Sequence, residues 1–395
     1  MVWSRKLLKF TIICLVSFTV INFSPLLAQN SPKTELRGVW LTNVDSDVLF
    51  SRSNLRNAVR RLQRLHFNTL YPVVYNGGYT LFPSQTMEKY IGIPLDPEPG
   101  LQGRDMLQEI ITQGKEHKMA VIPWFEYGLM APENSELVKK HPQWVTQRRD
   151  GSKVITFGEN NEVRVVRLNP VHPEVQQFLT DLVTEVVQKY DVDGIQFDDH
   201  FGFPVDMGYD EYTIELYKSE HGGNPPPEDH RNPEWMRWRA RFVTELWVKI
   251  FAAVRFHKPN AVVSLAPNPR QFSYEFFLQD WHRWAQLGMV DELIVQVYRD
   301  NIFSFAGELE DRELYALQEK IPVAVGILTG LRIRDVDMGL IVDQVNLTRL
   351  LGLDGFSYFF YETLGKRDGA FRSLHGEPAI RPTRNRILNE NELNR

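Results

Sequence analysis

The sequence predicts a (β/α)8 TIM barrel of the α/β class, and three observations lead to this prediction. Apolar runs of strand length alternate with segments of helical periodicity eight times between residues 35 and 365. Long connections follow the second, third and fourth strands, whereas the connections that follow the helices are only a few residues. A doubly wound sheet would place G-x-G-x-x-G after its first strand, and the sequence has no such pattern there. We therefore expect one barrel with its cleft at the carboxyl ends of the strands.

The expected strands and helices follow one another in a regular order. Each helical segment carries apolar residues three or four apart, as Leu55, Val59 and Leu62 do. The expected strand and helix pairs are 36–43 with 54–66, 69–75 with 105–118, 120–127 with 172–190, 194–200 with 234–257, 261–268 with 280–287, 293–298 with 305–320, 322–329 with 336–351, and 355–362 with the C-terminal region. The long connections are 76–104, 131–171 and 201–233.

The first 28 residues have the features of a signal peptide. Three basic residues precede a mostly apolar stretch from Phe10 to Phe23, and small Ala28 ends the segment. We expect cleavage after Ala28 and a periplasmic or secreted protein. Because Leu26 fits the cleavage site less well than alanine, an uncleaved membrane anchor is the alternative. The remaining chain is expected to comprise a linker (29–34), the barrel (35–365) and a charged C-terminal extension (366–395).

Composition limits the expected partners. The net charge is −5 for the whole chain and −8 without the first 28 residues, which argues against nucleic acid as a partner. Contact with a membrane is expected only if the N-terminal segment stays uncleaved. Aromatic residues make up 12% of the chain, which suits stacking on sugar rings but equally suits a large aromatic core. The single cysteine, Cys14, lies in the signal peptide, so the mature chain has no thiol for disulfides, zinc binding or nucleophilic attack.

The fourth expected strand ends in the most distinctive residues of the chain. Because side chains alternate along a strand, Gln196, Asp198 and His200 share one face, and the apolar residues between them share the other. We expect the polar face to line the mouth of the barrel and Asp199 to turn away from it. The structural alternative is that Asp198 or Asp199 only caps the following helix.

The same alternation brings polar and aromatic residues of other strands to the mouth. In the third strand, for example, Trp124 and Glu126 share a face, whereas in the eighth strand alternation does not choose between the faces. Cleavage of a glycosidic bond needs two carboxyl groups, while amides and Arg can bind sugar hydroxyls and aromatic rings can stack on sugars. The alternative is that these residues are interior polar groups of the barrel. The expected set around Asp198 is Trp40, Tyr75, Trp124, Glu126, Asn268, Arg270, Gln296, Tyr298, Tyr361 and Glu362.

Five ordered motifs resemble the glycosyl hydrolase-like 10 family of exported bacterial proteins. The resemblance extends from Glu35 to Leu364 and implies a TIM-barrel glycosidase. A branch of that family acts in the cell envelope on peptidoglycan glycan strands whose stem peptides have been removed, and the resemblance implies such a substrate here. The motifs are Glu35–Thr42, Arg167–Val175, Asp193–His200, Ser264–Pro269 and Gln296–Arg299.

The segment Asp193–Asp198 also resembles the fourth strand of α-amylase-type barrels, in which the final aspartate is the nucleophile. This likeness implies that Asp198 is the nucleophile of the present chain. The amylase-like pattern ends the fifth strand in glutamate, whereas here that strand ends in Asn268-Pro269-Arg270. The general acid must therefore come from another strand.

We accordingly expect an exported glycoside hydrolase that acts on a cell-envelope polysaccharide. Asp198 would be nucleophile or base, Glu362 or Glu126 the acid, and Asp199 a residue that orients its neighbour. No metal or organic cofactor is expected. One alternative is a non-catalytic barrel that binds envelope glycan. Another is a metal-dependent hydrolase or deacetylase that uses Asp198, Asp199 and His200.

Overall fold

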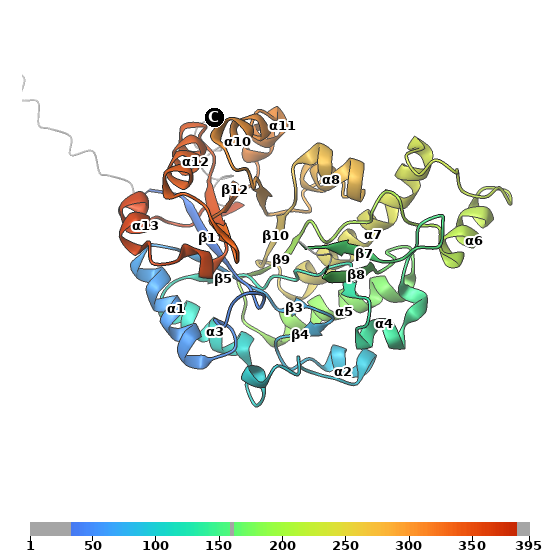
Figure 1. Cartoon of the computed structure of the whole chain (residues 1–395), viewed down its shortest axis with the longest axis horizontal. Coiled ribbons are helices and arrows are strands. Elements are labelled where there is room, and N and C mark those ends of the chain that lie inside the picture. The colour runs from blue at the N-terminus through green and yellow to red at the C-terminus, as the bar shows by residue number, and fades with distance from the viewer. Residues whose placement is uncertain (1–32, 159–161, 385–395) are drawn as a thin grey trace, which may run out of the picture. The chain divides into compact units, whose positions relative to one another are not determined.

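The computed structural model describes residues 33–158 and 162–384, so the predicted signal peptide lies outside the described residues. Within them, eight parallel strands form the predicted TIM barrel (Figure 1). They pair in the order β5-β2-β1-β15-β12-β11-β10-β9. The strands are β1 (Leu36–Leu41), β2 (Thr69–Pro72), β5 (Ala120–Val121), β9 (Gly194–Asp198), β10 (Val262–Ala266), β11 (Glu292–Gln296), β12 (Val323–Leu328) and β15 (Gly355–Phe359).

The barrel closes between β5 and β9. β5 is short because Pro123 has no N–H to donate to a neighbouring strand. The chain nevertheless continues beside β9, where the Gln196 N–H donates to the Pro123 carbonyl and the Phe125 N–H donates to the Gln196 carbonyl, both at 2.8 Å. These bonds carry the third strand past β5 to Glu126, at the carboxyl end of the barrel.

Helices lie between successive strands, as the apolar spacing predicts. α1 shows how the sequence places them: Ser51 caps its first turn, and Leu55, Val59 and Leu62 are buried. The expected helix 305–320 is instead two helices, because the first ends at Glu308 and Asp311 then caps the second through the Glu313 N–H. The helices after the strands are α1 (Arg52–Arg64), α3 (Met106–Glu116), α5 (Pro173–Lys189), α7 (Pro233–His257), α8 (Arg270–Phe277), α9 (Trp281–Gln286), α10 (Ile302–Glu308), α11 (Arg312–Gln318), α12 (Met338–Leu350) and α13 (Asp368–His375).

The long connections carry short elements of their own at the carboxyl ends of the strands, where a barrel builds its cleft. The connection after β2 holds β3 (Tyr75–Asn76), β4 (Tyr79–Thr80), α2 (Gln85–Ile91) and η1 (Pro99–Leu101). The connection after β5 holds β6 (Met130–Pro132), α4 (Glu136–Lys140), η2 (Pro142–Trp144), β7 (Ile155–Phe157) and β8 (Val163–Arg167). Smaller additions are α6 (Glu211–Glu220) after β9, β13 (Gly330–Leu331) with β14 (Arg334–Asp335) after β12, and η3 (Tyr361–Leu364) after β15.

The opposite end of the barrel is closed by residues that follow α13. The Ile380 N–H donates to the Lys33 carbonyl, and Arg381 extends beneath the strands. Its guanidinium pairs with Glu292, which is 1% exposed, and its Nε donates to Thr69 Oγ1 at 3.0 Å. Glu292 also accepts from the Tyr71 hydroxyl at 2.8 Å. The segment assigned from sequence to a C-terminal extension therefore includes the eighth helix and the residues that close the barrel.

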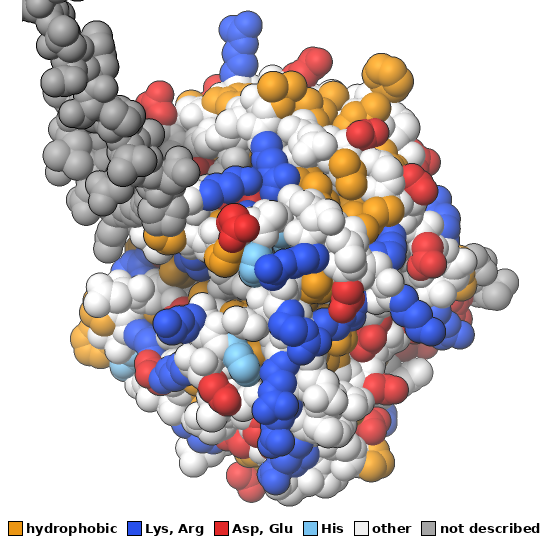
Figure 2. All heavy atoms as spheres, turned by 90° about the vertical axis from the view of Figure 1, so that its left-hand side faces the viewer, with side chains coloured by type: hydrophobic (Ala, Val, Ile, Leu, Met, Phe, Trp, Pro, Cys, Tyr) orange, Lys and Arg blue, Asp and Glu red, His pale blue; other side chains and the backbone are white. Residues whose placement is uncertain are grey.

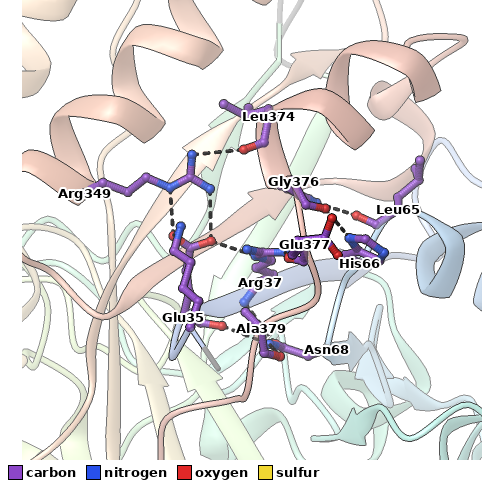
Figure 3. A network of polar contacts seen from close by, with 12 residues as sticks. Glu35, Arg37, Leu65, His66, Asn68, Arg349, Leu374, Gly376, Glu377 and Ala379 are labelled. Carbon is purple, nitrogen blue, oxygen red and sulfur yellow. Dashed lines mark hydrogen bonds and ion pairs between the residues drawn. The ribbon is translucent and has the colours of Figure 1, made fainter. Parts of the chain in front are cut away.

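A second ionic network joins the start of β1 to α12 and to the segment after α13 (Figure 3). Buried Glu35 binds Arg37 at 2.6 Å and Arg349 at 2.8 Å, and Arg37 Nη1 donates to the Glu377 carbonyl at 2.8 Å. Burial alone would raise the pKa of Glu35, but Arg349, Lys33 and Arg37 lower it to about 2. The start of β1 is thus connected to α12 by charged side chains and to the segment after α13 by the Arg37 guanidinium.

The outer surface beside this network is rich in basic side chains. Figure 2 shows the side of the molecule that carries α1 and α13, where Lys and Arg side chains form a band. The exposed arginines of α1 are Arg52, Arg56, Arg60 and Arg64. None of the helices in the described part of the chain is long and apolar enough to cross a membrane.

Candidate active site

Asp198 is the last residue of β9, and its buried carboxylate faces the barrel interior. Trp124 Nε1 donates to Oδ2 at 3.0 Å, and the His200 backbone N–H donates to Oδ1 at 2.8 Å. The His200 ring Nδ1 lies 3.2 Å from both carboxylate oxygens. Burial raises the pKa of Asp198, while His200 opposes that rise by stabilising the ionised form. The indole and the imidazole therefore hold a single, defined carboxylate at the floor of the mouth.

His200 carries positive charge at neutral pH. Burial would lower the pKa of its imidazole, but the neighbouring Asp198 and Asp199 raise it to about 9. The protonated Nδ1 then donates to Asp198. Asp198 and His200 thus form an ion pair within three residues of chain.

Asp199 also faces the mouth, which corrects the expectation that it turns away. Asn268 Nδ2 donates to its Oδ2, and Gln296 Nε2 donates to its Oδ1, each at 3.0 Å. The alternation of side chains holds only while the chain is extended, and β9 ends at Asp198. Asp199 lies in the turn that follows, so its side chain reaches the carboxyl ends of β10 and β11. It positions two of the amides that the sequence placed at the site.

Glu126 approaches Asp198 from the third strand. Its Oε2 accepts from Asn76 Nδ2 at 2.5 Å, and the same amide donates to Asn43 Oδ1 at 3.0 Å. Burial raises the pKa of Glu126 to about 8; His200 lowers it, and the charge of Asp198 contributes to the rise. That contribution requires the two carboxyl groups to lie near each other. The raised pKa favours the protonated form of Glu126 at neutral pH, and His200 favours the ionised form of Asp198.

Glu362, the other candidate acid, lies farther out on the rim. It belongs to η3, is exposed, and accepts a hydrogen bond from Ser46 Oγ at 2.7 Å. Tyr361 lies beside it, half-buried, with the Arg61 guanidinium 5.3 Å from its ring centroid. Both residues line a cavity of about 620 Å³ next to the loop after β1. The sequence left the acid open between two glutamates, and the geometry favours Glu126.

Aromatic rings form the floor and one wall of the mouth. Trp40 Nε1 donates to Gln196 Oε1 at 2.7 Å, and its ring lies 6.4 Å from that of Trp124. Phe359 contacts both indoles and also Tyr298, and the centroids of the Phe359 and Tyr298 rings lie 5.6 Å apart. Burial, with Asp199 and Asp198 nearby, raises the pKa of Tyr298 well above its usual value, so its hydroxyl stays protonated. The predicted aromatic residues of strands one, three and six do meet at the mouth.

Two predicted contact residues lie elsewhere. Tyr75 is fully buried, and its ring packs 6.0 Å from Phe178 of α5, because the chain turns outward after β2 into the β3–β4 hairpin. Arg270 is exposed at the start of α8, where its Nε donates to Asp311 at 2.9 Å. Tyr75 therefore belongs to the layer between strands and helices, and Arg270 forms an ion pair at the rim.

Arg167 is a site residue that the sequence reasoning did not single out. It ends β8, is buried, and donates from Nη1 to the His200 carbonyl at 3.1 Å. Burial lowers its pKa to about 10 against the opposing charges of Asp199 and Asp198. The residue opens the motif Arg167–Val175, but that motif gave no indication that an antiparallel strand in a loop carries it into the mouth.

Residues 35–347 match the family described as Glycosyl hydrolase-like 10. This chain belongs to the glycosyl hydrolase-like 10 family. The site described above lies inside the matched region, apart from Phe359 at the end of β15 and Tyr361 and Glu362 of η3.

This family member is similar to known proteins in sequence and in fold. It is 27% identical to "Glycosyl hydrolase DigH" of Escherichia coli K12, with 67% of this chain and 65% of that protein covered, so it spans about two thirds of the relative's length. The glycoside hydrolase domain of PgaB (BpsB) from Bordetella bronchiseptica has a TM-score of 0.62 at 14% identity, over 87% of this chain and 99% of that one. Alpha-L-fucosidase isoenzyme 2 from Paenibacillus thiaminolyticus has a TM-score of 0.63 at 18% identity, over 87% and 48%. These structural likenesses concern the fold.

The same residues of this glycosyl hydrolase-like 10 protein also have the spacing of metal ligands. Asp198, Asp199 and His200 each offer one ligand atom, and these atoms lie within 4.8 Å of one another. Protein donors already occupy them: Trp124 and His200 at Asp198, and two amides at Asp199. Donors within the protein therefore satisfy both carboxylates. The alternative of a metal-dependent hydrolase or deacetylase is tested separately, with a chelator.

Proposed function

We propose that this protein hydrolyses glycosidic bonds, with Glu126 as general acid and Asp198 as nucleophile or general base. The observation that carries the proposal is the placement of two carboxyl groups with different surroundings at the mouth. Glu126 accepts from the Asn76 amide, and burial raises its pKa to about 8. Asp198 instead accepts from the Trp124 indole and the His200 N–H, and the His200 imidazole opposes the rise that burial causes in the pKa of Asp198. Two carboxyl groups in different surroundings can supply the acid and the base of one reaction.

The chemistry follows from this difference in surroundings. Glu126 gives its proton to the glycosidic oxygen as the bond to the anomeric carbon breaks, so the departing sugar leaves as a neutral alcohol. Asp198 either bonds to the anomeric carbon or takes a proton from the water that attacks it. Positive charge that develops at the anomeric carbon is stabilised by the carboxylates of Asp198 and Asp199.

The residues around the carboxylates fit a sugar. Asp199 holds the Asn268 and Gln296 amides in place, which leaves their carbonyl oxygens available to accept bonds from sugar hydroxyls. The Tyr298 hydroxyl stays protonated and can donate. The Trp40 and Trp124 indole N–H groups are already used within the protein, so these rings contribute shape and an apolar surface.

For the substrate we propose glycan strands of peptidoglycan from which the stem peptides have been removed, cleaved outside the cytoplasm. The proposal is supported by the signal-peptide features of residues 1–28 and by the branch of the family that acts on such strands. The mildly acidic charge of the chain also argues against a nucleic acid substrate.

The test uses purified protein on amidase-treated and untreated peptidoglycan sacculi, with products identified by mass. We expect soluble glycan fragments with new reducing ends from the amidase-treated sacculi, and none with the Asp198→Asn variant. Binding to the sacculi without new reducing ends would instead support the non-catalytic glycan-binding barrel. Loss of cleavage in the presence of a chelator would support the metal-dependent alternative, because the proposed acid and base need no metal ion.

A further inference from the structure

The rim cavity next to Glu362 has the size and lining of a sugar-binding site. Its volume of about 620 Å³ falls within the usual range for small-ligand pockets. The loop after β1, helix α1 and η3 form its walls, and no residue of this cavity other than Tyr361 and Glu362 was expected from sequence. Polar side chains predominate, beside the half-buried ring of one tyrosine: Asn43, Ser46, Asn54, Asn57, Tyr361 and Glu362.

A chain of amides connects this cavity to the proposed acid. Asn43 forms part of the cavity wall, and its Oδ1 accepts from Asn76 Nδ2 at 3.0 Å. The same Asn76 nitrogen donates to Glu126 at 2.5 Å. A single amide therefore contacts both the proton donor and the wall of the cavity.

The order of the strands gives the direction in which a glycan would run. Glu126 follows β5, which pairs with β2, and β2 in turn pairs with β1, beside which the cavity opens. Asp198 ends β9, on the other side of Glu126, followed by Asn268 after β10 and Gln296 at the end of β11. The acid thus lies between the carboxylate that acts on the anomeric carbon and the cavity. The sugar that departs with the protonated oxygen lies on the cavity side.

The charge of the cavity restricts which sugar can bind. Asp45, Asp47 and Glu362 all line it. Arg332 approaches Asp45 at 3.5 Å from an exposed position, and the Arg61 guanidinium lies over the Tyr361 ring but is paired with Asp368. A sugar with a carboxylate substituent would meet repulsion from these groups. In peptidoglycan, N-acetylmuramic acid has such a carboxylate and N-acetylglucosamine does not.

We propose that this cavity is the binding site for the departing sugar and that it selects an uncharged hexosamine, N-acetylglucosamine, over a carboxylated one. The inference rests on the proposed glycosidase function. It assigns Asn54 and Asn57 of α1 to substrate binding and predicts which of the two alternating bonds of the glycan is cleaved. The new reducing end belongs to the sugar that stays behind, which is N-acetylmuramic acid.

The test compares two substrates and three forms of the full chain. The substrates are peptide-free glycan strands, which fill the cavity, and the 4-nitrophenyl glycoside of the N-acetylglucosaminyl–N-acetylmuramic acid disaccharide, which places no sugar there. The forms are the wild type, the double variant Asn54→Ala/Asn57→Ala, and Arg56→Ala as matched control. Arg56 is exposed on the same helix and is not part of the cavity.

We expect the double variant to lower kcat/KM on the strands about tenfold, since two hydrogen-bonding groups are lost, and to leave the aryl glycoside unchanged. Arg56→Ala should match the wild type on both substrates. Borohydride reduction followed by mass analysis should give reduced N-acetylmuramic acid as the product end.

Three results would overturn the inference while leaving the glycosidase function standing. They are equal losses on both substrates, no loss on the strands, and N-acetylglucosamine at the reducing end. A wild type that cleaves neither substrate would overturn the proposed function itself, and the inference with it.

Discussion

The two ends of this barrel bury carboxylates in opposite ways. At the closed end, Glu35 meets Arg37 and Arg349, and Glu292 meets Arg381 (Figure 3 shows the Glu35 network). At the mouth, Glu126 meets an amide, the His200 imidazole and other carboxylates rather than a guanidinium. The pKa of Glu35 falls to about 2, whereas the pKa of Glu126 rises to about 8.

The paired carboxylates at the closed end stabilise the fold, whereas the carboxyl group of Glu126 at the mouth serves the proposed reaction. A buried carboxylate with two arginine partners stays charged and stabilises the fold throughout the neutral range. A buried carboxyl group without such a partner destabilises the fold when it ionises, but it retains a proton that can be transferred. The following predictions change three carboxyl groups at the mouth and one at the closed end, and they run from the largest expected effect in free energy to the smallest.

Asp198→Asn should abolish most turnover. An amide can neither bond to the anomeric carbon nor take a proton from water, so we expect glycan release to fall by about 10³-fold or more. The near-isosteric side chain should leave the melting temperature within a few degrees of the wild type. Release of reducing ends and thermal melting, measured on the same preparations, check both expectations. Near-normal turnover would remove Asp198 from the reaction.

Glu126→Gln should lower turnover by about 10²-fold to 10³-fold because the proton donor is lost. In the wild type, activity should decline as pH rises through about 8, when Glu126 loses its proton. The native carboxyl binds a proton that the unfolded one releases above its ordinary pKa of about 4.5, so the wild type loses stability between those pH values. The variant should therefore melt at a higher temperature than the wild type at pH 9. Equal melting at that pH would contradict the buried, proton-bearing state.

Glu35→Gln tests the closed end. It leaves Arg37 and Arg349 without their anion, and we expect a loss of about 3 kcal/mol in the free energy of unfolding. The pKa of Glu35 is lowered, so its contribution is present above pH 4.5 and is lost as pH falls toward 2. Denaturant unfolding at pH 7 and pH 3 measures both effects. The value of kcat at low temperature should stay within twofold of the wild type, and a larger change would mean that the two ends are coupled.

Among the three variants at the mouth, Asp199→Asn should give the smallest effect, about tenfold in kcat/KM. Its two oxygens orient the Asn268 and Gln296 amides, and an asparagine can accept only one of these bonds. We expect KM to rise more than kcat falls, because the loss concerns sugar contacts. Steady-state kinetics on peptide-free strands measure the two constants. A larger loss than that of Asp198→Asn would assign the main role to Asp199.

Residues that lie in regular elements were predictable from sequence. Alternation along the strands placed Trp124, Gln196 and Asp198 correctly, because strand geometry depends only on the local chain. The prediction failed for Asp199, which lies one residue beyond the end of β9, and for Tyr75, which lies beyond β2 in a hairpin. In both places the chain direction depends on packing against distant segments.

The sequence did not predict the site residues that loops contribute, because the course of a loop also depends on packing against distant segments. Arg167 reaches His200 from β8, which pairs with other strands of the loop after β5. Asn76 reaches Glu126 from the hairpin after β2. The choice between Glu126 and Glu362 likewise needed burial and neighbouring charge, which a sequence does not contain.

The closure of the barrel by Arg381 has a consequence for how the chain folds. Arg37 and its partner Glu377 are 340 positions apart, and Arg381 reaches Thr69 across 312 positions. During synthesis the first strands emerge long before Arg349, which pairs with Glu35, and before Arg381, which donates to Thr69. Contacts of such sequence separation are formed late and slowly, so the barrel completes only when its last segment arrives. We expect chains truncated before residue 377 to keep the lower end open and to be cleaved faster by proteases than the full chain, which limited proteolysis of the two forms can measure.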